Sequence, residues 1–172
     1  MSTDTPNRLG KGMIVVACLL CLGLLTVFFN HILEKKHNPN TRVQSTHALD
    51  GGIEVVLTRN SIGHYVAQGF INQQAVTFFL DTGATQVSIP LHIANKLGLE
   101  RGLPMQVGTA NGTITVYSTR LAIVALGDIV LRDISASINP QDTGDDILLG
   151  MSFLRQIEFT QRGNQLILRQ HP

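Results

Sequence analysis

The order of apolar and polar positions divides the chain into three parts with different textures. Residues 13–29 form an apolar run without a charged side chain, and residues 31–52 are mostly polar with neither helical nor strand periodicity. From Ile53 onward, short apolar runs alternate with turn residues, which is typical of β-strands joined by tight connections. The pattern therefore predicts an apolar N-terminal segment, a connecting stretch and a mainly β domain.

The apolar run slightly undershoots the roughly 20 residues that cross a bilayer as a helix, and Ile32 and Leu33 make up the difference. No small-residue cleavage site of the secretory type follows it, because the next residues are Asn30 and His31. We therefore expect an uncleaved signal anchor. The predicted organisation is a tail over 1–12, a transmembrane signal anchor over 13–33, a linker over 34–52 and a folded domain over 53–172.

The orientation of this anchor is not decided by charge. Arg8 and Lys11 precede the apolar run, and Lys35, Lys36 and Arg42 follow it, so the positive-inside rule favours neither side. A short N-terminal tail is compatible with the tail inside and the main domain exported.

Within the folded part, apolar runs predict seven strands and one well-marked helix. Pro90 suits the first turn of that helix, Leu91, Ala94 and Leu97 recur at helical spacing, and Gly98 can end it. The pairs that sit where tight hairpins need them are Asn72-Gln73, Asn111-Gly112, Gly127-Asp128 and Gly163-Asn164. The predicted strands are 53–57, 63–71, 75–80, 114–126, 133–138, 146–150 and 164–169.

Composition excludes several kinds of partner and cofactor. The 13 basic and 12 acidic residues are scattered and give a net charge of +1, which argues against a nucleic-acid partner. Both cysteines, Cys18 and Cys21, lie in the apolar segment, so the β domain has no disulfide or cysteine metal site. The six histidines show no metal-ligand spacing. We expect no metal and no cofactor.

One short stretch carries candidate chemistry. Asp81-Thr82-Gly83 directly follows the apolar run AVTFFL, and burying an unpaired carboxylate costs several kcal/mol. Either the aspartate is not buried, or it has a function. A second copy, Asp142-Thr143-Gly144, has no apolar strand before it and is interpreted as a solvated turn.

The context of the first copy resembles the retropepsin-like aspartic proteases, and most closely their single-lobed, membrane-anchored bacterial members. The stretch FFLDTGATQVSIP is followed by LHIANKLGL, then by the hairpin signal at Asn111-Gly112, and later by Ile147-Leu148-Leu149-Gly150 with a short helix from Met151 to Leu154. This order of pieces is much more specific than the tripeptide alone. The resemblance covers roughly residues 53–168.

The resemblance implies a single acid-protease lobe, a closed β-barrel with one or two short helices. It implies that Asp81, with Thr82 and Gly83, forms the catalytic motif, and that Thr82 crosses to a second subunit. The flap and substrate-binding residues it implies are Ala84, Ala110, Asn111 and Gly112, and Leu149 and Gly150 support the site. Val107, Ile114 and Val116 are expected to give the substrate cleft an apolar lining.

The function expected from these observations is a homodimeric aspartic endopeptidase in which each subunit supplies one Asp81, acting on a peptide or protein substrate. Its expected location is the inner membrane, single-pass, with the protease domain in the periplasm. Two alternatives stay open. One is a catalytically silent scaffolding or binding module with the same fold. The other is a regulator that cleaves only its own linker.

One feature of viral relatives is missing from the sequence. The resemblance implies that an acidic residue after DTGA pairs with an arginine after the late glycine, but Thr85 and Met151 occupy these places. Because both members are absent, no unpaired charge is left behind. We expect other contacts to brace the dimer, with the strand 166–168 as a candidate edge for pairing with its twin.

Overall fold

The computed structural model describes residues 5–109 and 112–172, and the chain divides into two compact units after His37. The first unit is a single helix, α1 (Thr5–His37). The second unit begins at Asn38 and contains eleven strands and two short helices within the described residues. The predicted mainly β class is confirmed.

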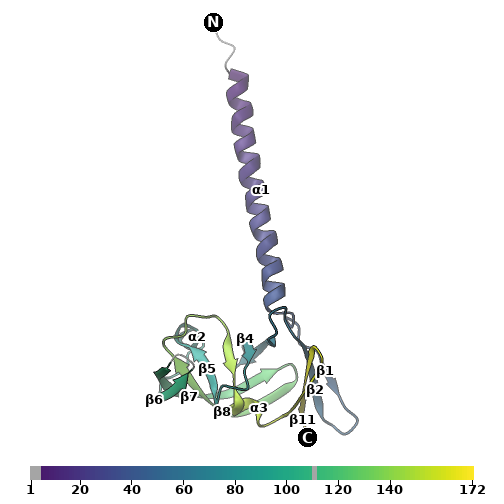
Figure 1. The fold of residues 1–172 in the computed structure, drawn as a ribbon, viewed down its shortest axis with the longest axis vertical. Helices are drawn as coiled ribbons and strands as arrows, with labels where there is room; N and C mark the ends of the chain where they lie inside the picture. The colour runs from purple at the N-terminus through teal and green to yellow at the C-terminus, as the bar shows by residue number, and fades with distance from the viewer. Residues whose placement is uncertain (1–4, 110–111) are drawn as a thin grey trace. The chain divides into compact units, whose positions relative to one another are not determined.

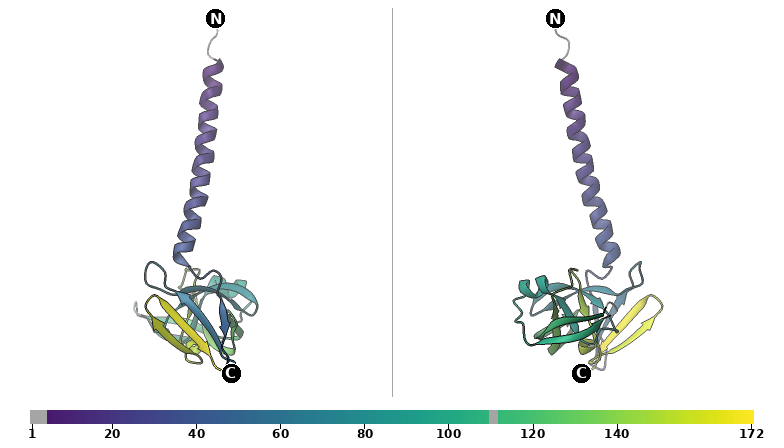
Figure 2. Two further views of the ribbon diagram at one scale, coloured as in Figure 1. Left: turned by 90° about the vertical axis from the view of Figure 1, so that its right-hand side faces the viewer. Right: turned by 60° about the vertical axis from the view of Figure 1, so that its left-hand side comes forward.

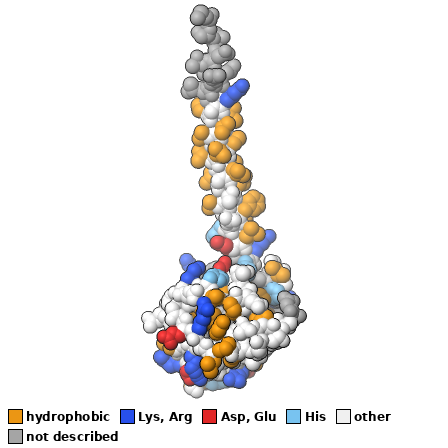
Figure 3. Space-filling view, turned by 90° about the vertical axis from the view of Figure 1, so that its left-hand side faces the viewer, with side chains coloured by type: hydrophobic (Ala, Val, Ile, Leu, Met, Phe, Trp, Pro, Cys, Tyr) orange, Lys and Arg blue, Asp and Glu red, His pale blue; other side chains and the backbone are white. Residues whose placement is uncertain are grey.

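Helix α1 contains a 28-residue stretch, Gly10–His37, that is long and apolar enough to cross a membrane. At about 1.5 Å per residue it exceeds the roughly 30 Å hydrocarbon core of a bilayer. Its large apolar side chains are exposed to the surroundings, and hydrophobic atoms cover much of the helix face in Figure 3. By length and composition this helix could be a membrane anchor or a signal sequence.

A four-stranded antiparallel sheet joins the two ends of the second unit. Its strands are β1 (Ser45–His47), β2 (Ile53–Thr58), β10 (Glu158–Arg162) and β11 (Gln165–Gln170), in the order β1-β2-β11-β10. Figure 2 shows the yellow β10–β11 hairpin lying beside β2. The first and last strands of the β domain therefore belong to one sheet within one subunit.

The larger sheet has seven strands in the order β3-β4-β9-β5-β8-β7-β6, and β3 also pairs with β7. This extra pairing closes six strands into a barrel and leaves β6 as an extension on β7 (Figure 1). Helix α2 (Leu91–Lys96) follows β5, and helix α3 (Met151–Leu154) follows β9. The strands are β3 (Val66–Ile71), β4 (Gln74–Leu80), β5 (Val87–Pro90), β6 (Pro104–Thr109), β7 (Gly112–Leu126), β8 (Ile129–Asn139) and β9 (Ile147–Leu149).

One continuous core lies between the two sheets and under the short helices. Phe78 of β4, Phe153 of α3 and Leu57 of β2 are among its largest fully buried side chains. Because these residues come from both sheets and from α3, the core holds α3 and the end of β4 in one rigid assembly.

Most predicted elements are present, and the differences are instructive. The seven predicted strands and the helix after Pro90 are confirmed, and β1, β5, β6 and β10 are additional. The C-terminal strand was expected to be a free edge, but this was wrong, because β11 pairs with β2 on one side and with β10 on the other. The edge on that side of the sheet is β10.

The stretch expected to be a linker, 34–52, has regular structure on both sides of the unit boundary. Its first residues end α1, and residues from Asn38 onward belong to the second unit. Asn40 is buried, and its amide donates to the carbonyls of Thr58 (2.9 Å) and Val66 (2.7 Å) and accepts from the Thr58 N–H (2.7 Å). Asn40 thus connects the end of β2 to the start of β3.

Candidate active site

The Asp81 loop begins where β4 leaves the barrel. Leu80 pairs with Leu149 of β9, and the Asp81 N–H donates to the Leu149 carbonyl at 3.3 Å. Asp81 is half-buried, while Thr82 and Gly83 are exposed in the subunit. The carboxylate therefore lies at the end of a buried strand and not inside it, which removes the burial cost considered above.

The carboxylate is oriented by its own loop. Its Oδ1 atom accepts a hydrogen bond from the Gly83 N–H at 2.8 Å, and the Ala84 N–H donates to the Asp81 carbonyl at 3.3 Å. A Cβ atom on Gly83 would lie 3.1 Å from Oδ1. Any larger residue at Gly83 would therefore press directly on the carboxylate.

Gly150 packs against the other side of the loop. A Cβ atom there would lie 2.3 Å from the Gln86 carbonyl oxygen and 2.6 Å from that of Ala84, so only glycine fits without movement of the backbone. The next residue, Met151, donates its N–H to the Ala84 carbonyl at 2.8 Å. The preceding residue, Leu149, is fully buried. The end of β9 and the start of α3 thus support the Asp81 loop from behind.

Ser152 is a supporting residue that the sequence did not reveal. It is 3% exposed on α3, and its Oγ accepts the Val87 N–H at 3.0 Å, just after the loop. A serine in the four-residue stretch MSFL carries no signal of this role, because its partner lies 65 positions away.

A cleft of about 810 Å³ lies between the Asp81 loop and the β6–β7 hairpin. Val107, Ile114 and Val116 line it, as expected, together with Met105. Asp81 is the only ionisable side chain among the described residues that line this cleft. Thr82 is not among the lining residues and is exposed.

The β6–β7 hairpin is the candidate flap. Ala110 and Asn111, expected at its tip, lie outside the described residues. Gly112 has a φ of +111°, which favours glycine, and its carbonyl accepts the Thr109 hydroxyl at 2.8 Å. The strands leading to the tip carry the apolar cleft residues, so this hairpin forms one wall of the cleft.

The second Asp-Thr-Gly copy has the same local turn in a different setting. The Gly144 N–H donates to Asp142 Oδ1 at 2.9 Å, which closely matches the bond at Asp81. Asp142 faces a smaller depression of about 390 Å³ beside α2, and neighbouring Asp145 contacts His92 at 3.1 Å. The tripeptide alone therefore produces the turn. Two features distinguish Asp81: the close packing of Gly150 against its loop, and the large cleft beside it.

Comparison with known families agrees with this geometry. Residues 67–156, slightly more than half of the chain, match the family described as "gag-polyprotein putative aspartyl protease". The chain belongs to this aspartyl protease family. The matched range includes the Asp81 loop, the cleft and α3.

Two similar proteins extend this picture of a retropepsin-like chain. A retropepsin-like aspartic protease from Rickettsia conorii has a similar structure, with a TM-score of 0.57, 25% identity, and coverage of 75% of this chain and 95% of that one. A Sinorhizobium protein described as "uncharacterized protein in cobV 5′ region" is 32% identical over 124 residues, which is 70% of this chain. The aligned part covers 53% of that relative, so the chain spans about half of its length.

Proposed function

We propose that the protein is a homodimeric aspartic endopeptidase whose active site contains Asp81 from each of two subunits. The observation that carries the proposal is the cleft itself. Its described lining has a single ionisable side chain, the Asp81 carboxylate, next to apolar residues suited to a peptide substrate. Hydrolysis by two carboxylates then requires a second Asp81 from another copy.

The exposure of the loop supports the same arrangement. Thr82 and Gly83 are exposed in the subunit although the backbone behind them is tightly packed against Gly150. A rigid, exposed loop at the mouth of a cleft is suited to meeting its symmetry mate. In the proposed dimer, Thr82 contacts the second subunit and the β6–β7 hairpin covers the substrate.

The chemistry follows from two carboxylates held close together. Because two like charges at short range cannot both be ionised, the pair shares one proton. The ionised Asp81 takes a proton from a water molecule as its oxygen attacks the peptide carbonyl carbon, and the protonated Asp81 donates a hydrogen bond to the carbonyl oxygen. The tetrahedral intermediate then breaks its C–N bond as the nitrogen receives the proton that the first Asp81 took from water, which releases a carboxylic acid and an amine and restores the pair with one proton. This route requires neither a metal nor a covalent intermediate.

The proposed location is the inner membrane, single-pass, with residues 13–33 as the anchor and the protease domain in the periplasm. The support is the apolar helix α1 and its length. Protease added to cells with a permeabilised outer membrane should digest the second unit. Protection of that unit would reverse the proposed orientation.

A pair of matched substitutions tests the activity. Full-length protein in detergent is incubated with a fluorescently labelled denatured protein at several pH values. Asp81→Asn should abolish cleavage, because neither the base nor the shared proton remains. Asp142→Asn changes the same tripeptide in the same local turn and should leave cleavage unchanged.

The result distinguishes the enzyme from a silent module. Cleavage that survives in Asp81→Asn, or that is lost equally in Asp142→Asn, would contradict the assignment. Lack of cleavage by the unmodified protein under all conditions would favour the scaffolding alternative.

A further inference from the structure

Strand β10 leaves one edge of the four-stranded sheet open. It is the last strand of the order β1-β2-β11-β10, and its five residues, Glu158 to Arg162, are all exposed. Among the described residues, only β11 pairs with it. An exposed edge strand presents unpaired backbone N–H and C=O groups to any further strand.

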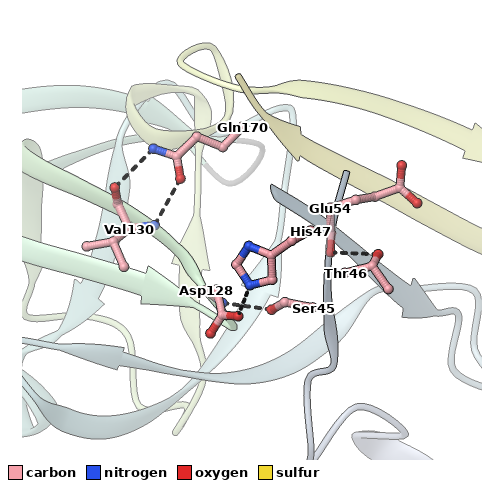
Figure 4. A network of polar contacts seen from close by, with 7 residues as sticks. All are labelled: Ser45, Thr46, His47, Glu54, Asp128, Val130 and Gln170. Carbon is pink, nitrogen blue, oxygen red and sulfur yellow. Dashed lines mark hydrogen bonds and ion pairs between the residues drawn. The ribbon is translucent and has the colours of Figure 1, made fainter. Parts of the chain in front are cut away.

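On the other side of the sheet, side chains of β1 and β11 contact the barrel (Figure 4). On β1, the Ser45 hydroxyl accepts the Asp128 N–H at 2.8 Å, and His47 contacts the Asp128 carboxylate at 3.0 Å. On β11, Gln170 bonds the Val130 backbone through both its amide oxygen (3.2 Å) and its amide nitrogen (3.3 Å). These contacts attach the small sheet to the β7–β8 end of the barrel, and β10 is the edge at the other end of the strand order.

The sequence of β10, EFTQR, is complementary to itself. When two copies pair antiparallel about a twofold axis perpendicular to the sheet, the side chains of facing residues lie on the same face of the sheet. Because side chains alternate between faces along a strand, facing residues must then be an even number of positions apart in the sequence. The axis therefore passes through a single residue and not between two. Centring on Thr160 pairs every residue of β10 and sets Glu158 opposite Arg162 of the other copy, twice by symmetry. Centring on Phe159 or Gln161 pairs fewer residues and brings a charged residue opposite Thr160.

The charges on neighbouring strands continue the same pattern. Glu54 on β2 lies opposite Arg169 on β11, and Arg169 lies opposite Glu158 on β10. An Arg162 from a second copy would extend this row to four alternating charges across the sheet. Within the subunit, Glu158 also contacts His171 at 3.2 Å, and Arg169 pairs with Asp50.

Charged residues on an edge usually prevent pairing with unrelated strands. In β10, Glu158 and Arg162 disfavour pairing with other strands or in other registers, and they favour pairing with a second copy of β10. Opposite charges on directly facing residues stabilise strand pairing, and like charges weaken it.

We propose that β10 pairs with β10 of a second copy, in the register centred on Thr160, and joins the two small sheets into one continuous sheet across the dimer. The inference rests on the proposed homodimer and assigns its bracing contact. Helix α3, whose first residue holds the Asp81 loop through Ala84, directly precedes β10 in the chain. The pairing thus connects the dimer contact to the catalytic loop.

Charge reversal provides the first test. Glu158→Arg and Arg162→Glu each place like charges opposite one another in a homodimer, and each should raise the dimer dissociation constant about tenfold, equivalent to about 1.4 kcal/mol. An equimolar mixture of the two variants restores opposite charges at both pairs, so mixed dimers should form with near-normal affinity. The readout is energy transfer between labelled full-length copies in detergent.

Controls separate this contact from a general charge effect. Arg120→Glu makes the same change of charge as Arg162→Glu at an exposed ion pair with Asp133 and should leave dimerisation unchanged. Recovery in the mixture also shows that both variants are folded. Failure of the mixture to recover, or unchanged affinity in both single variants, would overturn the proposed register.

Cross-linking tests the centre of the register directly. In full-length protein with Cys18 and Cys21 replaced by serine, Thr160→Cys places two cysteines opposite each other at a Cα separation of about 5 Å, which suits a disulfide. Gln161→Cys is equally exposed but is offset from its own mate and should cross-link much less. Equal cross-linking of both, or of neither, would contradict the proposal.

The outcomes remain distinct from those of the activity test. If cleavage depends on Asp81 but the β10 variants dimerise normally, the homodimer stands and the β10 contact is wrong. If Thr160→Cys cross-links but the unmodified protein cleaves nothing, the contact stands and the endopeptidase assignment fails.

Discussion

Gly150→Ala should be among the most damaging conservative substitutions in the domain. The added Cβ would lie 2.3 Å from the Gln86 carbonyl oxygen, 2.6 Å from that of Ala84 and 2.8 Å from the Gln86 carbonyl carbon. All three atoms belong to the backbone, so no side chain can rotate away to relieve the clash. Either β9 or the Asp81 loop must move.

The magnitude can be worked from this contact. Overpacking a tight site costs about 1–3 kcal/mol. Movement of the loop away from α3 also weakens the 2.8 Å bond between the Met151 N–H and the Ala84 carbonyl, which adds about 1 kcal/mol. We therefore expect the free energy of unfolding to fall by about 2–4 kcal/mol and proteolytic activity to fall more than stability alone explains, because Asp81 is displaced.

Urea unfolding followed by tyrosine fluorescence measures the effect in the β domain alone. The chain has no tryptophan, and its two tyrosines, Tyr65 and Tyr117, both lie in the second unit. Gly108→Ala is the matched control, since a Cβ there meets nothing within 4 Å, and its free energy of unfolding should stay within about 1 kcal/mol of the parent. Equal stabilities of the Gly150→Ala variant and the parent would refute the packing argument.

Two further predictions concern residues outside the cleft. Asn40→Ala removes a buried amide with three hydrogen bonds, and the Thr58 N–H and the Val66 carbonyl lose their partner. The same urea assay should therefore show that the free energy of unfolding falls by about 2–4 kcal/mol. A fall of less than about 1 kcal/mol would contradict the role of Asn40 between β2 and β3. The hydrogen bond from the Gly52 N–H, and then the charge of Arg169, hold the pKa of Asp50 below its ordinary value. The ionised carboxylate therefore stabilises the fold at pH values above its unfolded-state pKa of about 4. This stabilisation is lost as the pH falls through the folded-state pKa. Asp50→Asn should therefore lower stability at neutral pH with a deficit that shrinks in acid, and a deficit independent of pH would contradict this.

The strands that could be predicted from sequence are those whose burial comes from apolar side chains. Strand β4 reads QAVTFFL and β9 reads ILL. Their runs of apolar residues predict strands without other information, and the structure buries most of those residues at least partly. Strand β10, EFTQR, is exposed along its whole length and exists because its backbone pairs with β11. Strand β5, VSIP, is short and ends in proline, and a proline argues against a strand when only the sequence is known. Because β10 has no apolar signal in the sequence, the sequence alone predicts β11 as an edge, whereas β10 occupies that edge.

The site divides in the same way. Asp81 and Gly150 could be identified because their motifs lie in the right order along the chain, whereas the contact between them depends on the pairing of β4 with β9. Ser152 depends on a hydrogen bond to a distant backbone group and has no local signature. The tripeptide could not by itself distinguish Asp81 from Asp142, since both form the same turn. The apolar run before Asp81, which Asp142 lacks, distinguishes the two copies in the sequence, and in the structure the large cleft lies at Asp81.

A mixing experiment tests the central claim, that two Asp81 side chains form one active site, most directly. The parent protein and Asp81→Asn are combined in equal amounts, dissociated by dilution and reassociated, and cleavage per total protein is compared with that of the parent alone. If each active site needs an aspartate from both subunits, only dimers of two parent chains are active, and random association leaves about one quarter of the activity. Activity of about one half would show that each subunit acts alone and would contradict the shared site.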